Sequence, residues 1–204
     1  MSDKKTISKA RFDKEAANYD QSARFELVRS RYRFVIEEIQ KHQFKTWLDV
    51  GCGTGALLAV IREQRKDVQL FGIDLSEEMI KVARAKLGEK ADLRVSDSER
   101  LPFEDRKFDL ITCTFSFHHY PHPVEALIEM KRVLSQGGVL IIADPLLFTP
   151  LREILNLLAP LRKEGTFRPR KKVSNFVQSA GIEVFKLERV DWFSCLMVAG
   201  RNHG

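Results

Sequence analysis

Residues 47–55 read Trp-Leu-Asp-Val-Gly-Cys-Gly-Thr-Gly, an apolar run that leads straight into three closely spaced glycines. A helical pattern begins directly afterwards, at Ala56. A turn this tight brings backbone N–H groups and the positive end of a helix up to a ligand, and glycine is required where a Cβ would block the approach. The stretch therefore predicts a strand, a turn that binds a polar, nucleotide-like ligand, and a helix.

Outward from this turn, short apolar runs rich in β-branched residues alternate with stretches of helical period, which is typical of a parallel sheet with crossover helices. The expected strands cover 46–50, 68–74, 92–96, 108–114 and 139–144, and the expected helices cover 56–66, 76–87, 123–134 and 151–159. Two further runs, 182–190 and 192–199, are too close together for a crossover helix, so they must pair antiparallel. The pattern predicts an α/β protein whose sheet ends in a hairpin.

Local signals refine this expectation. Ser76 can cap the helix that follows it, Pro123 suits a first helical turn, and Gly137-Gly138 is expected to end a helix in left-handed backbone. Residues 11–40 are expected to form one or two amphipathic helices, and 145–172 one irregular insertion.

Length and composition limit the class of protein. The chain has 204 residues, 44% hydrophobic and 30% charged, which fits one globular domain. The sequence has neither the ~18 to 20 apolar residues of a membrane span nor a secretory signal at its start. We therefore expect a soluble protein in the cytoplasm. Cys52, Cys113 and Cys195 are an odd number at wide spacing, so reduced thiols are expected.

The formal net charge of +6 is unevenly distributed. Residues 1–45 hold 11 basic and 7 acidic side chains, and residues 151–172 hold 7 and 2, whereas the middle of the chain is slightly acidic. Two interpretations stay open here: ordinary solvated helix faces, or attraction of an anionic substrate.

Two acids follow predicted strands. Asp74 ends the second strand about 20 residues after the glycines, where a ribose-binding acid belongs. Because Gly51, Gly53 and Ala56 also satisfy the dinucleotide fingerprint, a hydride-transfer enzyme stays open at this point. Asp97, at the end of the third strand, would project from the same sheet edge and could accept a hydrogen bond from an adenine amine.

Four motifs cover about residues 45–145: 48–55, then 72–76 with Met79, then 97–103, and the segment from 108 to 138. Taken together, they resemble the class I S-adenosylmethionine-dependent methyltransferases, in the small-molecule branch that includes ubiquinone and menaquinone biosynthesis enzymes. The resemblance implies a Rossmann-like three-layer α/β/α sandwich with a mostly parallel seven-stranded sheet. It also implies one domain, divided into an N-terminal helical cap (1–43), a cofactor-binding core (44–145), a basic insertion (146–172) and a last helix with the terminal hairpin (173–204).

The cofactor implied by the resemblance is S-adenosyl-L-methionine, with S-adenosyl-L-homocysteine as product. The glycine turn would contact its methionine end mainly through the backbone of Gly51, Cys52, Gly53 and Gly55. Asp49 would steady this turn and the cofactor's ammonium group, directly or through water. Asp74 would take both ribose hydroxyls, since a carboxylate offers two acceptor oxygens.

The remaining cofactor contacts are implied in the same way. Leu75 and Met79 would flank the adenine, and Asp97 and Ser98 would hold its edge. The methyl-donor end and the roof of the site would be formed by Thr114, Phe115 and Tyr19.

Methyl transfer requires a base only if the accepting atom must lose a proton, and His119 or His118 could serve as that base. A metal cluster of these two with His122 is not expected, because no carboxylate accompanies them at ligand spacing. No metal is predicted.

The acceptor is expected to be a small molecule. In relatives its pocket is built from the N-terminal helices and the insertion after strand five, which here are the two basic segments. The insertion is short for a lipid-quinone pocket, and its basic cluster favours a small anionic acceptor: Arg162, Lys163, Arg168, Arg170, Lys171 and Lys172. Nucleic acid is not expected but stays open, because aromatic residues are not interleaved with these charges. A monomer or homodimer is expected.

Three other functions were weighed. A tRNA or protein methyltransferase and a non-catalytic S-adenosylmethionine-binding protein stay open. An NAD-dependent dehydrogenase is disfavoured, because Asp97 and the terminal hairpin have no use in it and no tyrosine has a lysine four residues later.

Overall fold

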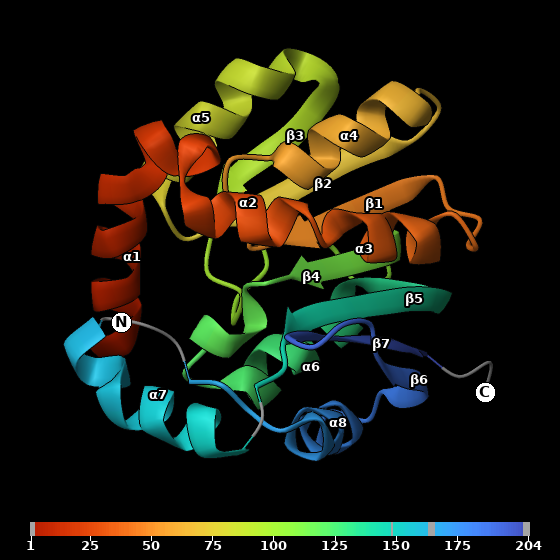
Figure 1. Ribbon diagram of the computed structural model, residues 1–204. Helices are drawn as coiled ribbons and strands as arrows, with labels where there is room; N and C mark the ends of the chain where they lie inside the picture. The colour runs from red at the N-terminus through yellow and green to blue at the C-terminus, as the bar shows by residue number, and fades with distance from the viewer. Residues whose placement is uncertain (1–2, 148, 163–165, 202–204) are drawn as a thin grey trace.

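The computed structural model describes residues 3–147, 149–162 and 166–201, and its strands form a seven-stranded sheet of order β3-β2-β1-β4-β5-β7-β6 (Figure 1). The strands are β1 (Thr46–Val50), β2 (Gln69–Asp74), β3 (Ala91–Val95), β4 (Phe108–Thr114), β5 (Leu134–Pro145), β6 (Glu183–Arg189) and β7 (Ser194–Gly200). Strands β1 to β5 are parallel, whereas β7 pairs antiparallel with both β5 and β6. The predicted mostly parallel sheet with a terminal hairpin is confirmed.

Helices cover both faces of the sheet. They are α1 (Asp3–Glu15), η1 (Ala16–Gln21), α2 (Ala23–Arg29), α3 (Tyr32–Ile39), α4 (Ala56–Gln64), α5 (Glu77–Leu87), η2 (Gly88–Lys90), η3 (Phe117–His119), α6 (Pro123–Val133), α7 (Thr149–Arg162) and α8 (Arg170–Ser179). Side chains such as Val35 and Ile80 from α3 and α5 pack with Trp47 on one face. Leu127 and Val177 from α6 and α8 pack on the other, which makes the three-layer α/β/α sandwich.

The central strand β1 explains why the glycine turn is where it is. Trp47, Leu48 and Val50 are fully buried, as expected for a strand covered on both faces. β1 lies between β2 and β4 and is parallel to both, with Val50 opposite Ile73. The carboxyl ends of these strands therefore meet at one edge of the sheet, and the turn after β1 lies at that edge.

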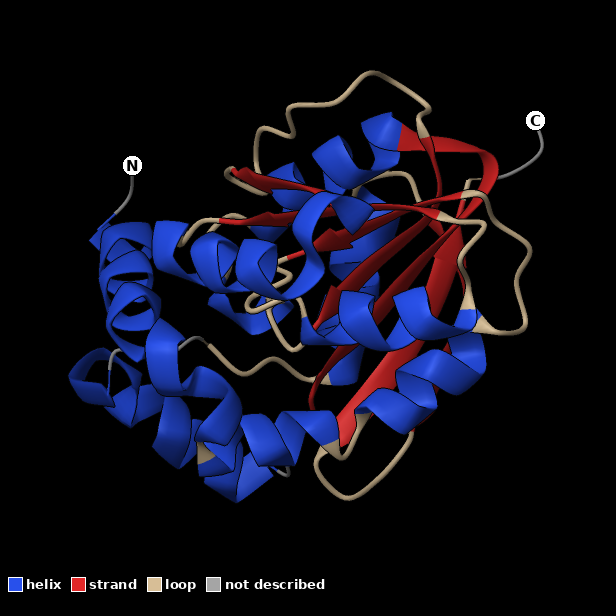
Figure 2. Ribbon diagram, turned by 90° about the horizontal axis from the view of Figure 1, so that it is seen from above, coloured by secondary structure: helices blue, strands red, loops and turns tan. Residues whose placement is uncertain are grey.

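Outside the sheet, α1 and α7 stand beyond the strand ends, at the left of Figure 1. Figure 2 shows from above that the chain begins among helices at this side, whereas α3 packs on a face of the sheet. The chain thus places a helical layer across the edge at which β1, β2 and β4 end.

Two predicted helix ends are confirmed. Ser76 is the N-cap of α5 and its side chain accepts a hydrogen bond from Met79 N, while Pro123 begins α6. The prediction for Gly137-Gly138 is wrong. α6 ends at Val133, and Gly137, with φ of +71°, lies inside β5.

The reason is an irregularity in strand pairing. Phe108 lies opposite Leu134 and Leu110 opposite Val139, so residues 135–138 stand opposite Asp109 alone. The extra residues must leave the ladder, and the left-handed glycine makes the bend that they need.

The N-terminal and insertion boundaries also differ from expectation. Residues 3–39 form four short helical pieces instead of one or two helices, because the extended backbone of Ser22 interrupts them and its side chain caps α2. In the insertion, the helix predicted over 151–159 is present as the longer, 14-residue α7, and α8 begins at Arg170, three residues before the expected last segment.

Arg132 on α6 fixes the loop that follows β3. Its guanidinium donates to the carbonyl oxygens of Leu101 and Phe103 and to the carboxylates of Asp105 and Glu129, over 2.8 to 2.9 Å. Hydrogen bonds to Glu129 and then Asp105 raise the pKa of Arg132. These contacts hold the 101–105 loop against α6.

We expect Arg132→Met to lower the free energy of unfolding by about 2 to 3 kcal/mol, because it removes charged hydrogen bonds and leaves Glu129 without its cation. Urea titration of both proteins measures the difference. The control is Arg29→Met, because Arg29 pairs with Glu26 at the surface, where both side chains are more than 60% exposed. Equal stability of Arg132→Met and the control would contradict the assignment.

Candidate functional site

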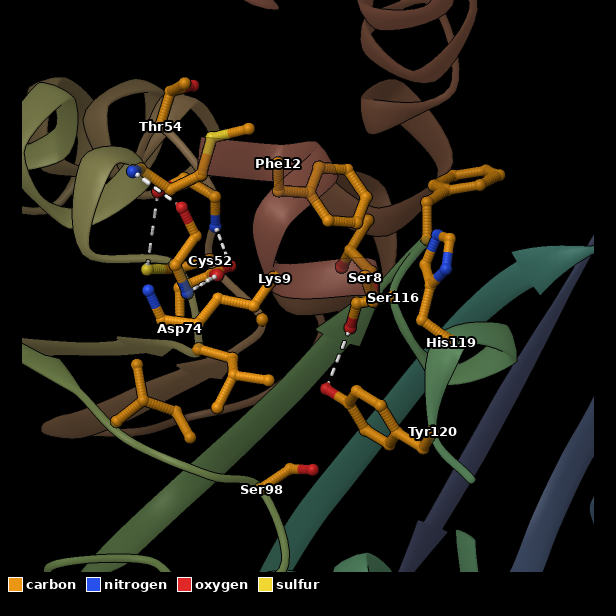
Figure 3. Close-up of a pocket in the computed structure, with 18 of the residues that line it drawn as sticks. Ser8, Lys9, Phe12, Cys52, Thr54, Asp74, Ser98, Ser116, His119 and Tyr120 are labelled. Carbon is orange, nitrogen blue, oxygen red and sulfur yellow. Dashed lines mark hydrogen bonds between the residues drawn. The ribbon is translucent and has the colours of Figure 1, made fainter. Parts of the chain in front are cut away.

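A pocket lies at the carboxyl edge of the sheet and encloses about 950 Å³ of empty space, its open mouth included. Its walls come from the glycine turn, the ends of β2 and β4, the loop after β3, and the helices α1, η1 and α2 (Figure 3). Eleven predicted cofactor residues line it: Tyr19, Gly51, Cys52, Gly53, Asp74, Leu75, Met79, Asp97, Ser98, Thr114 and Phe115. His119 lines it as well.

The glycine turn is built around the end of β2. Gly51 N and Cys52 N both donate to Ile73 O, over 2.8 and 2.9 Å. Gly51 and Gly53 have φ of +77° and +53°, and no other atom lies within 4 Å of where a Cβ on Gly53 would stand. The turn therefore leaves space at the pocket wall that any side chain on residue 53 would enter.

Asp74 joins two turns of the pocket wall. Its Oδ2 accepts from Gly53 N and its Oδ1 accepts from Ser76 N, each over 2.9 Å. Burial raises the pKa of Asp74. Because each carboxylate oxygen has a second lone pair, Asp74 can still accept from two ligand hydroxyls.

Two residues predicted to contact the cofactor lie outside this pocket. Asp49 is 3% exposed, and its Oδ1 accepts from Thr112 Oγ1 over 2.6 Å, while Trp47 Nε1 donates to Thr112 Oγ1. Burial raises the pKa of Asp49 to about 7. Gly55 is the N-cap of α4, where a Cβ would press on Ala83 and Leu87, so its role is in packing.

The acids of the loop after β3 bind a lysine of α1 at the site. Asp97 Oδ1 accepts from Glu99 N, and its Oδ2 accepts from Lys5 Nζ over 2.6 Å. Lys5 is only 6% exposed and also pairs with Glu99. Sequence reasoning missed Lys5, because α1 shows no amphipathic pattern that would point it inward.

Two residues at the end of β4 have unusual local structure. Thr114 Oγ1 is buried and has no hydrogen-bond partner in the described part of the chain. Phe115 has φ of +53°, which is rare outside glycine, and its N–H donates to Ala143 O. A buried orphan hydroxyl and a strained residue at one pocket wall are typical of a site that a ligand completes.

The two candidate bases are separated. His119 lines the pocket and packs edge-on against Phe12, with ring centroids 5.1 Å apart. Burial lowers its pKa well below the ordinary histidine value. His118 lies outside this pocket: its Nδ1 is 2.9 Å from Asp144 Oδ1, and its ring stacks on Phe167.

Helix α1 and the segment after it roof the pocket, and sequence reasoning did not find most of these residues. Ser8, Lys9 and Phe12 line the pocket from α1. Asp13 accepts from Ser76 Oγ over 2.6 Å, and Asp20 accepts from Thr54 Oγ1 over 2.6 Å. Of these residues, only Asp20 carried a sequence signal, because it follows Tyr19, which was predicted to form part of the roof.

Other site classes find no support. Across residues 3–147, 149–162 and 166–201, no three His, Cys, Asp or Glu side chains gather in a way that could hold a metal ion. Within the same ranges, no helix combines the length and the apolar character of a membrane span.

Comparison with known proteins agrees with this geometry. Residues 48–142 match the family model described as a methyltransferase domain. The parallel sheet with its terminal hairpin is the fold of the solved methyltransferase structures to which the chain is similar. The family model, the relatives and the fold together support the predicted resemblance to the class I S-adenosylmethionine-dependent methyltransferases.

Within that class the chain is similar to quinone-modifying relatives. It is 34% identical over 115 residues to a demethylmenaquinone methyltransferase of Deinococcus radiodurans, covering 55% of this chain and 48% of that protein. It is 31% identical to a ubiquinone/menaquinone biosynthesis C-methyltransferase of a Geobacter species, covering 71% of this chain and 65% of that protein. The chain thus spans about half to two thirds of the length of these relatives.

Solved structures show the same fold. A SAM-dependent methyltransferase from Aquifex aeolicus superposes with a TM-score of 0.74 at 24% identity, over 92% of this chain and 97% of that one. Human N-acetylserotonin methyltransferase in complex with SAM gives a TM-score of 0.65 at 19% identity, over 78% and 48% of the two chains.

The raised pKa of Asp49 predicts an unusual pH dependence of stability. Between about pH 4 and pH 7 the folded protein holds a proton on Asp49 that the unfolded chain has released, so this group makes stability fall as pH rises. Asp49→Asn keeps an acceptor for Thr112 and cannot ionise. We expect its free energy of unfolding, relative to wild type, to rise by about 2 to 4 kcal/mol across this range, measured by urea titration.

Asp109→Asn is the matched contrast. Asp109 accepts from Lys45 N and Thr46 N, and these hydrogen bonds, opposed by burial, lower its pKa. The wild-type carboxylate therefore adds stability that appears as pH rises through its ordinary range. The free energy of unfolding of Asp109→Asn, relative to wild type, should fall over that range. A flat difference for Asp49→Asn would contradict the assignment of a protonated Asp49.

Proposed function

We propose that this chain transfers a methyl group from S-adenosyl-L-methionine to a small-molecule acceptor by in-line displacement. The observation that carries the proposal is the pocket in which the glycine turn, Asp74, Asp97 and the end of β4 meet under one helical roof. Its shape and polar groups suit a nucleoside with an amino-acid tail. The cofactor supplies an electrophilic methyl group on a cationic sulfur when it is bound.

Different residues of the pocket would bind different parts of the cofactor. Asp74 would accept from the two ribose hydroxyls with its remaining lone pairs. Ser98 and Asp97 would hold the adenine edge, with Leu75 and Met79 against its faces. The backbone of the glycine turn would bind the methionine end, and Thr114 Oγ1 would gain the hydrogen-bond partner that it lacks.

The protein's contribution to catalysis would be mainly orientation and exclusion of water. Phe12, Tyr19, Phe25 and Phe115 give the donor end of the pocket aromatic walls. His119 is neutral at physiological pH because burial disfavours its cation, so its imidazole can accept a proton from an acceptor that must lose one. His118 faces Asp144 and would support the loop instead.

We do not assign the relatives' methyl acceptor to this chain. Their names specify quinone precursors, but the chain covers only part of their length. We infer one domain that acts as a monomer or homodimer in the cytoplasm. Neither a tRNA or protein substrate nor a non-catalytic role is favoured by the pocket, which a nucleoside-sized ligand and a small acceptor would fill.

Parallel calorimetric titrations with S-adenosylmethionine, S-adenosylhomocysteine and NAD test the proposal directly. Binding of the first two without NAD would support it. Binding of NAD alone would refute it. Transfer of a labelled methyl group to a panel of acceptors would then separate an enzyme from a protein that only binds the cofactor.

We expect Asp74→Ala to weaken S-adenosylmethionine binding at least about hundredfold, because two charge-assisted hydrogen bonds are lost. Asp67→Ala is the control: it removes an acid of the same charge from an exposed position just before β2. Calorimetry measures both affinities, and circular dichroism checks that both variants are folded. Unchanged affinity in folded Asp74→Ala would exclude the ribose assignment.

We expect His119→Gln to lower the methyl-transfer rate about hundredfold while cofactor affinity stays the same. Because burial lowers the pKa of His119 well below the ordinary histidine value, the wild-type rate should not fall as pH drops through the range in which an ordinary histidine gains its proton. Rates across this pH range provide the measurement. A variant that loses stability but not rate would assign His119 to packing alone.

A further inference from the structure

A buried lysine connects the first turn of α1 to the loop after β3. Lys5 Nζ lies 2.6 Å from Asp97 Oδ2 and also pairs with the carboxylate of Glu99. The side chain of Lys5 is only 8% exposed and lines the pocket. A lysine is rarely buried to this extent unless its charge is paired. The roof of the pocket therefore holds two acids of one loop through a single cation.

Other elements fix the same two acids. Asp97 Oδ1 accepts from Glu99 N over 3.0 Å, and both carboxylate oxygens of Glu99 lie 3.2 Å from the Nδ1 atom of His122, the residue before α6. Burial opposes the charge of Lys5, but hydrogen bonds to Asp97 and Glu99 outweigh it and raise the pKa of Lys5. The ammonium group is therefore a permanent part of this network at physiological pH.

The two oxygens of Asp97 have different donors. Glu99 N holds Oδ1 and Lys5 Nζ holds Oδ2, so the carboxylate cannot turn without breaking one of the two hydrogen bonds. Each oxygen keeps a second lone pair, and Asp97 lines the pocket. In the proposed function, one of these lone pairs accepts from the exocyclic amine of adenine. The direction of that lone pair then depends on Lys5.

Lys9 provides a matched comparison on the same helix. It also lines the pocket, one turn after Lys5. Its Nζ atom pairs with Asp13 of α1 itself over 2.8 Å and lies 4.0 Å from Glu77 of α5. Both lysines add a positive charge to the pocket wall, but Lys9 pairs with helical acids and Lys5 pairs with the loop that carries Asp97.

We propose that Lys5 is a positioning residue that makes the site select adenine over its deaminated counterpart, hypoxanthine. By holding Asp97 Oδ2, Lys5 directs a carboxylate, which accepts hydrogen bonds and donates none, at the exocyclic group of the base. Adenine has an N–H donor at this position, whereas hypoxanthine has a carbonyl oxygen that the carboxylate repels. This inference rests on the proposed methyltransferase function and assigns part of the base selectivity to the roof.

This role differs measurably from a merely structural one. If Lys5 only attached α1 to the core, its removal would lower stability or weaken every nucleoside ligand to the same extent. If Lys5 orients Asp97, its removal changes the ratio of affinities for two ligands that differ at the base alone. That ratio is therefore the quantity to measure.

The test uses the full chain and two probes, S-adenosylhomocysteine and S-inosylhomocysteine, whose affinities are measured by calorimetric titration. We expect wild type to bind the adenosyl probe at least about thirtyfold more tightly, because the inosyl probe loses a hydrogen bond to a charged group and places one oxygen against another. Lys5→Met should lower this ratio at least about tenfold. Lys9→Met, the control, should leave the ratio unchanged.

Two further variants complete the test. Asp97→Asn should lose the preference, because an amide can donate to the inosyl oxygen as well as accept. The charge-balanced variant Lys5→Gln/Glu99→Gln removes one cation and one acid together. It should show the same loss as Lys5→Met, and it replaces that variant if circular dichroism finds Lys5→Met unfolded.

The outcomes separate this inference from the proposed function. Equal binding of the two probes to wild type would overturn the inference. So would an unchanged ratio in a folded variant without Lys5, even where both probes bind more weakly. Failure of S-adenosylhomocysteine to bind wild type would instead refute the proposed function.

Discussion

The pocket depends on one half-buried carboxylate that joins two turns. Asp74 ends β2 and accepts one backbone N–H from the glycine turn and one from Ser76, at the start of α5. Neither turn is held by the backbone hydrogen bonds of strand pairing. The Asp74 carboxylate instead accepts the backbone N–H groups that a neighbouring strand would otherwise accept. Ser76 also contacts α1, because its hydroxyl donates a hydrogen bond to Asp13. The strand edge, α5 and the roof are therefore connected through the surroundings of a single side chain.

This arrangement has an electrostatic cost that a cationic ligand would reduce. Asp49 is buried and Asp74 is half-buried. Burial raises the pKa of each carboxyl group, and the charge of Asp74 raises the pKa of Asp49 further. A ligand with a positive sulfur and an ammonium group would stabilise both carboxylates in their charged forms. The site is thus better suited to such a cation than to a neutral or anionic ligand at the same turn.

The parts of the protein that follow from local chemistry could be predicted from the sequence. β1 and β4 were predicted at their observed bounds, because buried parallel strands are continuous apolar runs. Ser76 and Pro123 mark helix ends by their own backbone chemistry. Gly137 misled because left-handed glycine serves a strand irregularity as well as a helix end, and only the pairing of β4 with β5 distinguishes the two.

The site residues divide in the same way. Those that follow strand ends line the pocket, because the sheet edge positions them. Asp49 and His118 are near it in sequence but turn away, toward Thr112 and Asp144, and adjacency in sequence cannot reveal this. The residues of α1 that cover the pocket could not be predicted for a different reason. Helix α1 is polar, and its contacts are between residues far apart in the sequence, such as Lys5 with Asp97.

The pocket is built partly from strand ends and partly from the N-terminal helices. The donor and acceptor halves of the proposed site can therefore change separately. The donor half is made from strand ends that the sheet holds in register, so a substitution there disturbs the core. In the proposed function the acceptor half would be carried by α1, η1 and α2, which attach through a few polar contacts such as Asp20 with Thr54 and Lys86. Side chains on the outer faces of these helices can vary without loss of those contacts. In the proposed function, these outer faces are therefore where specificity for the acceptor would be set while the cofactor end remains unchanged.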